Sequence, residues 1–469
     1  MRKGSLESFT EPREYASLLR SNIRHVDEMT SSPSFLSLSL ALGSYTGIDD
    51  RVMRTIAARM LLTANESHEQ AFAYRPFAVW LHHFVWLVRA MIRSPRPQPL
   101  GAGAELLLGE WQDGASKRYD LLSHRASAAG ISNRVVNLNA TDSCGLVPAL
   151  RSLPQAIKTM RKLSQIRRVL GLNAAWVAAS VIREHLIGLR WRQTYQARVL
   201  LTACDNGEFY VRGHAARLSL VLVQNGCRTG SDACFIVADH YMALEPLGYP
   251  GCLLSETGSF RGHQAGSLAL ANHWASRPSR EPVPQIDLLW VSSFPGTDQW
   301  AQFEVSHGHA LPLSYLTNSF RAFIDFAKRA DVRATFAPRW PGECDALRQR
   351  GLDLSGVRIL DTSATSTYDA IERAEIVLSS FSTVVFEAMM IEKTAGFIFL
   401  TDDPEVIPFA RREHLLFDGG DEDEFAAFVE RLPSSQPKGA SFVVHPDATP
   451  QIIIDVVATD LMERTRAIP

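Results

Sequence analysis

The sequence predicts an α/β protein with two Rossmann-like β/α domains that face each other across a cleft, and a helical N-terminal extension. Two observations support this fold. Short apolar runs alternate with helical segments and polar turns through residues 101–275, and the same alternation starts again after residue 280. Between the two series lies a polar, proline-rich stretch, residues 271–285, which is typical of a linker.

The length of 469 residues is enough for two domains with separate cores. We expect a helical extension at 1–100, an N-terminal domain at 101–275, a C-terminal domain at 280–450 and a final helix at 451–469. The extension contains the most apolar segment of the chain, Phe72–Ile92, which histidines, arginines and a proline interrupt. A buried helix, a helix at a membrane interface and a membrane-spanning helix are alternatives for this segment.

Composition argues against several classes of function. The formal net charge of -2 argues against nucleic acid as the main partner. The six cysteines are scattered without a CxxC pair, so we expect neither a disulfide framework nor a zinc site. The first residues lack the apolar run of a signal peptide, which favours a cytoplasmic protein. The chain has no P-loop, no GxGxxG after a strand, no HExxH and no GxSxG motif, and we expect no catalytic metal.

The most informative stretch of the chain is Asp369–Leu400. It predicts a strand at Glu375–Ser379, a turn rich in Ser and Thr, a helix that carries Glu387, and a second strand that ends at Leu400. In a parallel sheet, the turn after such a strand faces the ligand crevice. Its backbone N–H groups and hydroxyls suit a phosphate, and Glu387, one helical turn after Thr383, can accept the hydroxyls of a ribose. Ordinary helix capping explains the same hydroxyls, so the turn alone leaves both interpretations open.

Other predicted strands also end in polar loops. Asp239–Leu247 is expected to be a helix, and Thr257–Arg261 a loop at a strand end. From the loops of the C-terminal domain we expect these donor-binding residues: Ser293, Arg339, Thr362, Ser382, Thr383 and Glu387. From the loops of the N-terminal domain we expect these residues to line the cleft or bind the acceptor: Gln224, Asn225, Gly258, Ser259 and Arg261.

Asp205 is the first candidate for a catalytic base. It follows a strongly apolar strand, where a carboxylate is costly unless it is hydrogen-bonded or faces the cleft. In the cleft it can take a proton from an attacking hydroxyl. Contact with a ligand and capping of the following helix are the alternatives. Glu208 is the second candidate base.

The motifs resemble those of a known class. Ala374–Gly396 (strand, SSFST, VVFEAMM, KTAG) resembles the nucleotide-binding domain of GT-B-fold glycosyltransferases that build bacterial surface polysaccharides. The strand end Ala337–Arg339 resembles the strand-end Lys/Arg-Pro motif of the same class. Four segments of the other domain resemble capsule and O-antigen transferases: Thr202–Glu208, Leu222–Gly226 (LVQNG), Asp239–Tyr241 (DHY) and Thr257–Arg261 (TGSFR). Phe381 stands where a third Ser is common, and the usual Pro after the Gly/Lys turn is absent.

The resemblance implies a metal-independent glycosyltransferase of capsule or lipopolysaccharide synthesis. It would move a sugar from a nucleotide-sugar donor to a glycan or lipid-linked glycan acceptor and would need no further cofactor. Ser382, Thr383 and Glu387 would hold the phosphate and ribose of the donor, and Asp205 would lie near the acceptor. The resemblance favours a cytoplasmic protein, with peripheral contact with the inner membrane as an alternative. A CDP-glycerol-type phosphotransferase, a sugar-nucleotide epimerase and a non-catalytic scaffold of the same fold also stay open.

Overall fold

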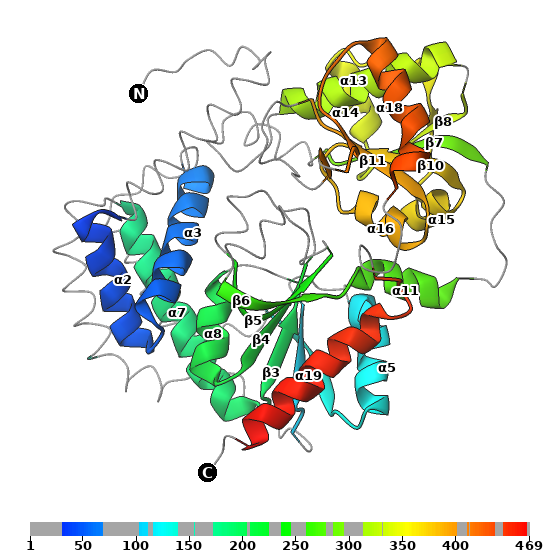
Figure 1. Cartoon of the computed structure of the whole chain (residues 1–469). Helices are drawn as coiled ribbons and strands as arrows, with labels where there is room; N and C mark the ends of the chain where they lie inside the picture. The colour runs from blue at the N-terminus through cyan, green and yellow to red at the C-terminus, as the bar shows by residue number, and fades with distance from the viewer. Residues whose placement is uncertain are drawn as a thin grey trace.

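The structure is a computed structural model. It describes residues 31–68, 103–110, 116–138, 154, 172–203, 207–224, 236–244, 259–277, 285–294, 313–330, 332–400, 410–411, 413–436 and 444–466. These residues form two parallel β-sheets with helices packed around them, which confirms the predicted fold of two Rossmann-like β/α domains (Figure 1). The apolar segment Phe72–Ile92 lies outside the described residues.

The first sheet has six strands in the part of the chain that is described, and their order is β2-β1-β3-β4-β5-β6. Every neighbouring pair is parallel. The strands are β1 (Leu106–Glu110), β2 (Asn133–Asn137), β3 (Val199–Thr202), β4 (Ser219–Val223), β5 (Val237–Ala243) and β6 (Ser259–Gln264). This order reverses direction between β1 and β3, as in a flavodoxin-like sheet.

The second sheet also has six strands within the described ranges, in the order β12-β11-β10-β7-β8-β9. The strands are β7 (Ile286–Val291), β8 (Ala334–Ala337), β9 (Arg358–Ile359), β10 (Ala374–Ser379), β11 (Thr394–Ile398) and β12 (Leu416–Phe417). Numbered within this domain, the order is 3-2-1-4-5-6, that of a dinucleotide-binding Rossmann sheet. The helices of this domain are α13 (Leu313–Ala330), α14 (Glu343–Gln349), α15 (Thr367–Glu372), α16 (Val384–Met390) and α18 (Glu422–Ser435), with the 3-10 turn η2 (Leu354–Gly356).

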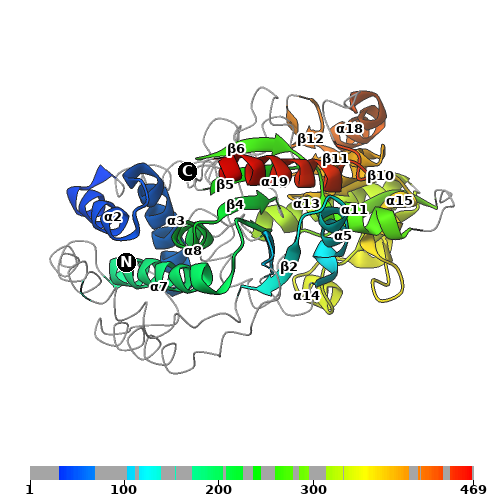
Figure 2. The ribbon, with the colours of Figure 1, turned by 90° about the horizontal axis from the view of Figure 1, so that it is seen from below.

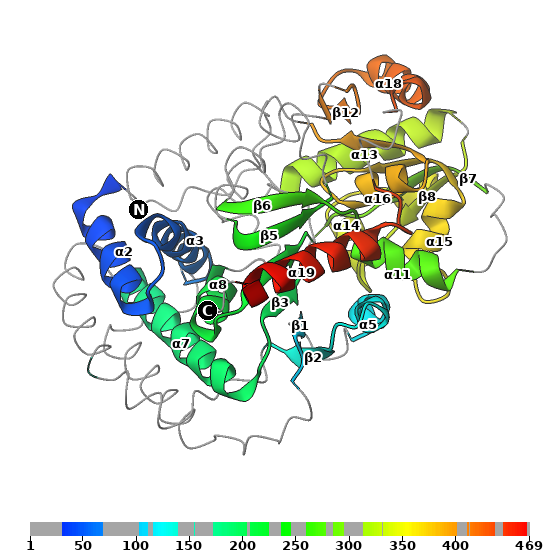
Figure 3. The ribbon, with the colours of Figure 1, turned by 60° about the horizontal axis from the view of Figure 1, so that its bottom comes forward.

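Alternate residues of the first sheet pack against different helices. Leu106, Leu108 and their neighbours pack with α5 (Asp120–Ala128), which follows η1 (Ser116–Tyr119), and with α19 (Thr449–Arg466). Leu107, Leu200 and their neighbours face the other way, toward α7 (Leu172–Thr194) and α8 (Gly207–Ala216). Since side chains of a strand alternate between faces, the sheet is covered on both sides. Of the final helix expected at 451–469, the described residues form α19, which ends at Arg466 and packs against the first domain (Figures 2 and 3).

The helices before the first strand form a further layer. α2 (Pro33–Thr46) and α3 (Asp50–His68) share a buried cluster with residues of α7, α8 and β5. That cluster includes Phe35, Ile56, Val181 and Val211. The described part of the N-terminal segment therefore packs directly on the first domain. No helix among the described residues is long and apolar enough to span a membrane.

Helix α11 (Leu268–Ser276) joins the two domains, and Figure 1 shows it at their junction. Leu268 belongs to the core of the first domain, whereas Leu270 belongs to the core of the second. Ser267 caps the helix, and its Oγ accepts a hydrogen bond of 3.2 Å from Leu270 N. Gly266 has a φ of +78°, and a Cβ added there would lie 2.6 Å from Thr449 Oγ1. The chain crosses between the domains first at α11 and a second time before α19, and these two crossings are therefore in contact.

Two sequence predictions are wrong in the first domain. In the described part of the helix expected at Asp239–Leu247, the chain forms strand β5 as far as Ala243, and the described residues of the loop expected at Thr257–Arg261 belong to strand β6, which begins at Ser259. The polar pair Asp239 and His240 is typical of a helix start. In the structure, however, Asp239 Oδ2 accepts a hydrogen bond of 2.7 Å from Leu220 N. Because tertiary partners satisfy the polar side chains, they are compatible with a strand.

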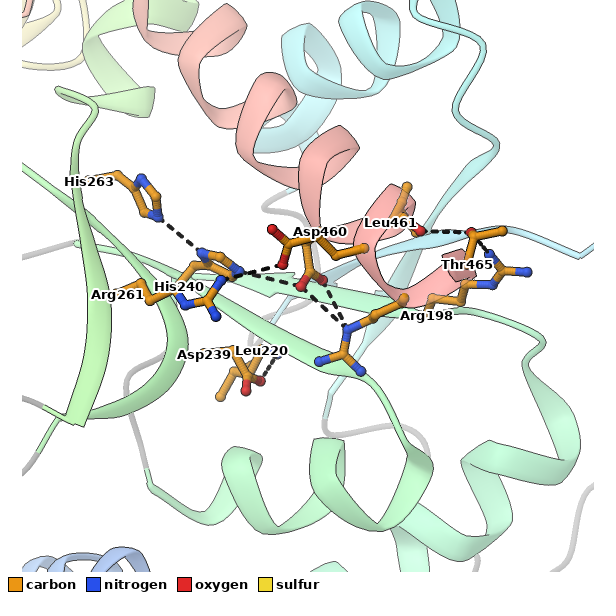
Figure 4. A network of polar contacts seen from close by, with 11 residues as sticks. Arg198, Leu220, Asp239, His240, Arg261, His263, Asp460, Leu461 and Thr465 are labelled. Carbon is orange, nitrogen blue, oxygen red and sulfur yellow. Dashed lines mark hydrogen bonds and ion pairs between the residues drawn. The ribbon is translucent and has the colours of Figure 1, made fainter. Parts of the chain in front are cut away.

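His240 belongs to a polar network that attaches α19 to the first sheet (Figure 4). Its Nδ1 lies 3.0 Å from His263 Nε2, and its Nε2 lies 3.4 Å from Asp460 Oδ1. Arg464 Nε lies 3.2 Å from Asp460 Oδ2. Burial alone would raise the pKa of Asp460, but the contact with His240 and the charge of Arg464 lower the pKa overall. The ionised carboxylate therefore stabilises the attachment of α19.

Candidate functional site

The strand order locates a ligand crevice in each domain. In open parallel sheets, ligands bind beyond the carboxyl ends of the two strands between which the order reverses. In the second sheet these strands are β7 and β10, and in the first they are β1 and β3. The predicted donor residues Ser293, Ser382 and Thr383 follow β7 and β10, and Asp205 follows β3. That these two edges enclose one cleft stays a prediction.

A hydrogen bond joins the ends of β7 and β10, and a neighbouring buried hydroxyl has no hydrogen-bond partner among the described residues. Ser379 Oγ donates a hydrogen bond of 2.7 Å to Val291 O. The next residue, Ser380, is buried, and its Oγ has no hydrogen-bond partner among the described residues. Buried polar groups without a partner are rare in folded proteins, so the Ser380 hydroxyl is a candidate to bind a ligand.

Glu387 lies close to this edge, in the first turns of α16, and is only 7% exposed. Its Oε1 accepts two hydrogen bonds, one of 2.5 Å from Ser267 Oγ and one of 3.1 Å from Tyr368 Oη. Ser267 is the cap of the interdomain helix α11, and Tyr368 lies in α15. The carboxylate is therefore at the junction of the two domains. Its Oε2 makes no hydrogen bond to the described part of the chain.

Burial sets the protonation of these groups. It raises the pKa of the Glu387 carboxyl, and the hydrogen bonds from Ser267 and Tyr368 lower that pKa in part. Burial and the neighbouring Glu387 raise the pKa of Tyr368 well above its ordinary value. The Tyr368 hydroxyl therefore keeps its proton and acts as a donor. Glu387 can offer its free oxygen as a hydrogen-bond acceptor above its raised pKa.

Glu343 braces the neighbouring loops. It is fully buried in the first turn of α14, and Ser292 Oγ donates to its Oε1. Its Oε2 accepts hydrogen bonds from the backbone N of Arg339 (2.7 Å) and of Trp340 (3.4 Å). Burial raises the pKa of Glu343, and these hydrogen bonds lower it in part. The loops after β7 and β8 are thus fixed relative to each other at the edge of the sheet.

The remaining donor candidates lie around this edge. Ser293 is half-buried directly after β7, and the side chain of Arg339 is exposed after β8. Thr362 is exposed in the turn after β9, the edge strand. Ser382 Oγ accepts a hydrogen bond of 3.3 Å from Val384 N, whereas Thr383 occupies the N-cap position of α16 without a capping bond from its side chain. Their roles in binding stay predictions.

In the first domain, fewer polar side chains near the carboxyl ends of β1 and β3 are among the described residues. Tyr119 Oη donates a hydrogen bond of 3.0 Å to Gly109 O and accepts one of 3.1 Å from Ala203 N, so it joins β1 to the end of β3. Glu110, the last residue of β1, is buried there as well. Asp205 lies outside the described residues. Glu208 lies in α8, and its side chain is outside them too.

The predicted acceptor residues are spread over this domain. Gln224 is buried, and its Oε1 accepts a hydrogen bond of 2.8 Å from Leu244 N, which joins the ends of β4 and β5. Ser259 begins β6 and so lies at the amino ends of the strands, whereas Gln224 follows the carboxyl end of β4. Arg261 lies within β6, and its exposed side chain pairs with Glu463 of α19 at 3.4 Å. Asn225 and Gly258 are outside the described residues. Acceptor binding by these residues stays a prediction.

Three polar residues of this site were not singled out from the sequence: Ser267, Glu343 and Tyr368. Each had a local signal. Ser267 precedes an apolar helix and Glu343 lies in a first helical turn, both typical of capping, and Tyr368 follows the capping Ser366. The contacts with Glu387 and Ser292, however, join residues far apart in the chain, and no local pattern reveals them.

No group of three or more His, Cys, Asp or Glu side chains in the described ranges is placed to hold a metal ion. No family model matches the chain, and no curated protein matches its sequence.

Several solved structures are similar to the chain. One is the S. aureus MnaA–UDP co-structure, with 12% identity, a TM-score of 0.44, and coverage of 77% of this chain and 97% of that one. A UDP-GlcNAc 2-epimerase from Neisseria meningitidis bound to UDP-GlcNAc has 11% identity, a TM-score of 0.42, and coverage of 76% and 99%. The wall teichoic acid polymerase TagF has 11% identity, a TM-score of 0.40, and coverage of 84% and 100%.

Proposed function

We propose that the protein is a glycosyltransferase that moves a sugar from a nucleotide-sugar donor to a glycan or lipid-linked glycan acceptor. The observation that carries this proposal is the carboxylate of Glu387. It is buried at the junction of two Rossmann-like domains, and it has one oxygen bound by the protein and one without a partner in the described chain. A ribose hydroxyl is a donor of the right kind for that oxygen. The resemblance of Ala374–Gly396 to the nucleotide-binding domain of GT-B-fold glycosyltransferases supports the same assignment.

The donor would lie over the carboxyl ends of β7 and β10. Glu387 would accept ribose hydroxyls, and the hydroxyls of Ser380, Ser382 and Thr383 are hydrogen-bond donors for phosphate oxygens. The exposed guanidinium of Arg339, whose backbone Glu343 fixes, would neutralise the phosphate charge. These groups together suit a nucleoside diphosphate.

In the reaction, the second domain would mainly bind the donor. The acceptor hydroxyl attacks the anomeric carbon, a carbon–oxygen bond forms, and the bond from that carbon to the phosphate oxygen breaks. The nucleoside diphosphate leaves with the bonding electron pair, and Arg339 stabilises its charge. Asp205, which follows β3 in the sequence, would take the proton of the acceptor hydroxyl. Polysaccharide synthesis at the cytoplasmic side of a membrane is the setting that we propose.

The test is incubation of the purified protein with a panel of UDP-, GDP- and CMP-sugars and a bacterial glycolipid extract, followed by mass spectrometry. We expect one donor to lose its sugar to an acceptor, and the Glu387→Gln variant to lose most of this transfer. An altered sugar on an intact nucleotide would identify an epimerase instead. If no nucleotide sugar is consumed and none raises the melting temperature, the proposal is wrong.

A further inference from the structure

Glu387 is held by hydroxyls from two different parts of the molecule. Ser267 follows the last strand of the first domain and caps α11, whereas Tyr368 belongs to α15 of the second domain. Both donate to the same oxygen, Oε1, at 2.5 Å and 3.1 Å. Two donors on one oxygen fix the direction and the rotation of the carboxylate, and therefore the position of the other oxygen, Oε2.

The two donors are themselves fixed. The ring of Tyr368 packs against the ring of His273 of α11, with 5.2 Å between the ring centroids. His273 Nε2 lies 3.2 Å from Glu372 Oε1 and 3.6 Å from Asp369 Oδ1, both on α15. Helix α11 is thus docked on α15 by the same cluster that holds Glu387. Ser267 in turn is 4% exposed and is bound to the backbone of its own helix.

We propose that Ser267 and Tyr368 are positioning residues for the ribose of the donor. The proposal rests on the function proposed above and adds to it the residues that set the selectivity for ribose. Because Oε1 is bound to the protein, the carboxylate is already fixed with Oε2 available to a ribose hydroxyl. The carboxylate then loses no rotational freedom when the ribose binds. Because Ser267 comes from the first domain, selectivity for ribose depends on the docking of the interdomain helix.

The test compares ribonucleotides with their 2′-deoxy forms. Isothermal titration of the full-length protein with UDP, GDP, CDP and ADP identifies the nucleotide that binds most tightly. The ratio of the Kd of its 2′-deoxy form to its own Kd then measures selectivity for ribose. This ratio is measured for the wild type, for Tyr368→Phe and for Ser267→Ala. Tyr368→Phe keeps the ring contact with His273 and removes only the hydroxyl.

Two control variants separate positioning from general destabilisation. Ser32→Ala removes a capping bond of the same length, 3.2 Å to Phe35 N, at helix α2. Tyr195→Phe removes a hydroxyl from a half-buried tyrosine at the end of α7, where the ring packs on Trp191. Neither control residue contacts Glu387 in the described structure.

We expect the wild type to prefer the ribonucleotide about 10-fold or more. Tyr368→Phe and Ser267→Ala are each expected to lower this preference about 3-fold or more, whereas both controls keep it. If the preference is unchanged in Tyr368→Phe and in Ser267→Ala, the positioning role is wrong while the proposed function stands. If no nucleotide binds, or the wild type does not distinguish the two sugars, the ribose site itself is wrong and the positioning role fails with it.

Discussion

The substitution Glu387→Gln distinguishes the roles of the two oxygens of the Glu387 carboxylate. An amide oxygen in the position of Oε1 can still accept the hydrogen bonds from Ser267 and Tyr368. The amide nitrogen then takes the position of Oε2, where it is a donor and carries no charge. The variant is therefore expected to keep the contacts of the domain junction and to lose the acceptor for the ribose.

The magnitude follows from that loss. A hydrogen bond to a charged group contributes about 1.5–3 kcal/mol, which corresponds to about 10- to 150-fold in Kd. Titration calorimetry with the preferred nucleoside diphosphate measures this change. The wild type should also bind more tightly as pH rises through the raised pKa of Glu387, because only the ionised form accepts through both oxygens. The Kd of the variant should not depend on pH in this range.

Stability serves as the control for this prediction. Because burial raises the pKa of Glu387 above its ordinary value of 4.5, the folded protein binds the proton more tightly than the unfolded chain does. The free energy of unfolding therefore falls as pH rises from about 4.5 through the raised pKa. Glu387→Gln removes this loss, so the variant should be at least as stable as the wild type at pH 7 in urea. A folded variant with a Kd within twofold of the wild type would refute the assignment of Glu387 to the ribose.

Three further predictions concern contacts that hold helices of the first domain and the two chain crossings in place; urea unfolding at pH 7 measures each of them, and for Asp460 also at lower pH. Gly266→Ala should cost more stability than Gly351→Ala. Both glycines have a φ near +80°, at +78° and +79°, which costs an alanine about 1–2 kcal/mol, but only the added Cβ at Gly266 meets other atoms. Equal losses would contradict the close contact of the two chain crossings. Glu184→Ala should cost about 3–5 kcal/mol because it leaves the buried Arg212, now 2.7 Å from Glu184, without its partner carboxylate. A loss below about 1 kcal/mol would show that water reaches this pair. Asp460→Asn should cost about 1–2 kcal/mol. Since the folded pKa of Asp460 is lowered, its contribution is present above the ordinary value of 3.8 and declines as pH falls through the lowered pKa. A difference that grows toward low pH would contradict this sign.

Much of the second domain could be predicted from the sequence because its elements are local. The strand predicted at Glu375–Ser379 and the helix that carries Glu387 are confirmed as β10 and α16. The apolar run and the Ser/Thr turn are contiguous in the sequence, and each pattern predicts the conformation of its own residues without distant contacts. In a parallel sheet, ligands bind beyond the carboxyl ends of the strands. Donor candidates beyond β7 and β10 could therefore be named once these two strands were predicted correctly.

The partners of Glu387 could not be predicted in the same way. Ser267 is 120 residues away in the chain, and its contact depends on how α11 crosses from one domain to the other. The error at Asp239–Leu247 has a similar cause. Polar residues in a strand conflict with local preference unless distant groups satisfy them, as α19 does for His240 through Asp460. Contacts of this kind become visible only in the folded chain.

A crystal structure of the protein with its preferred nucleoside diphosphate tests the central claim most directly. The quantity to measure is the distance from Glu387 Oε2 to the ribose hydroxyl oxygens. The account predicts about 2.6–3.2 Å to at least one of them, with Oε1 still bound to Ser267 and Tyr368. A nucleotide bound beyond hydrogen-bond reach of Glu387, or at a different edge of the two sheets, would contradict it.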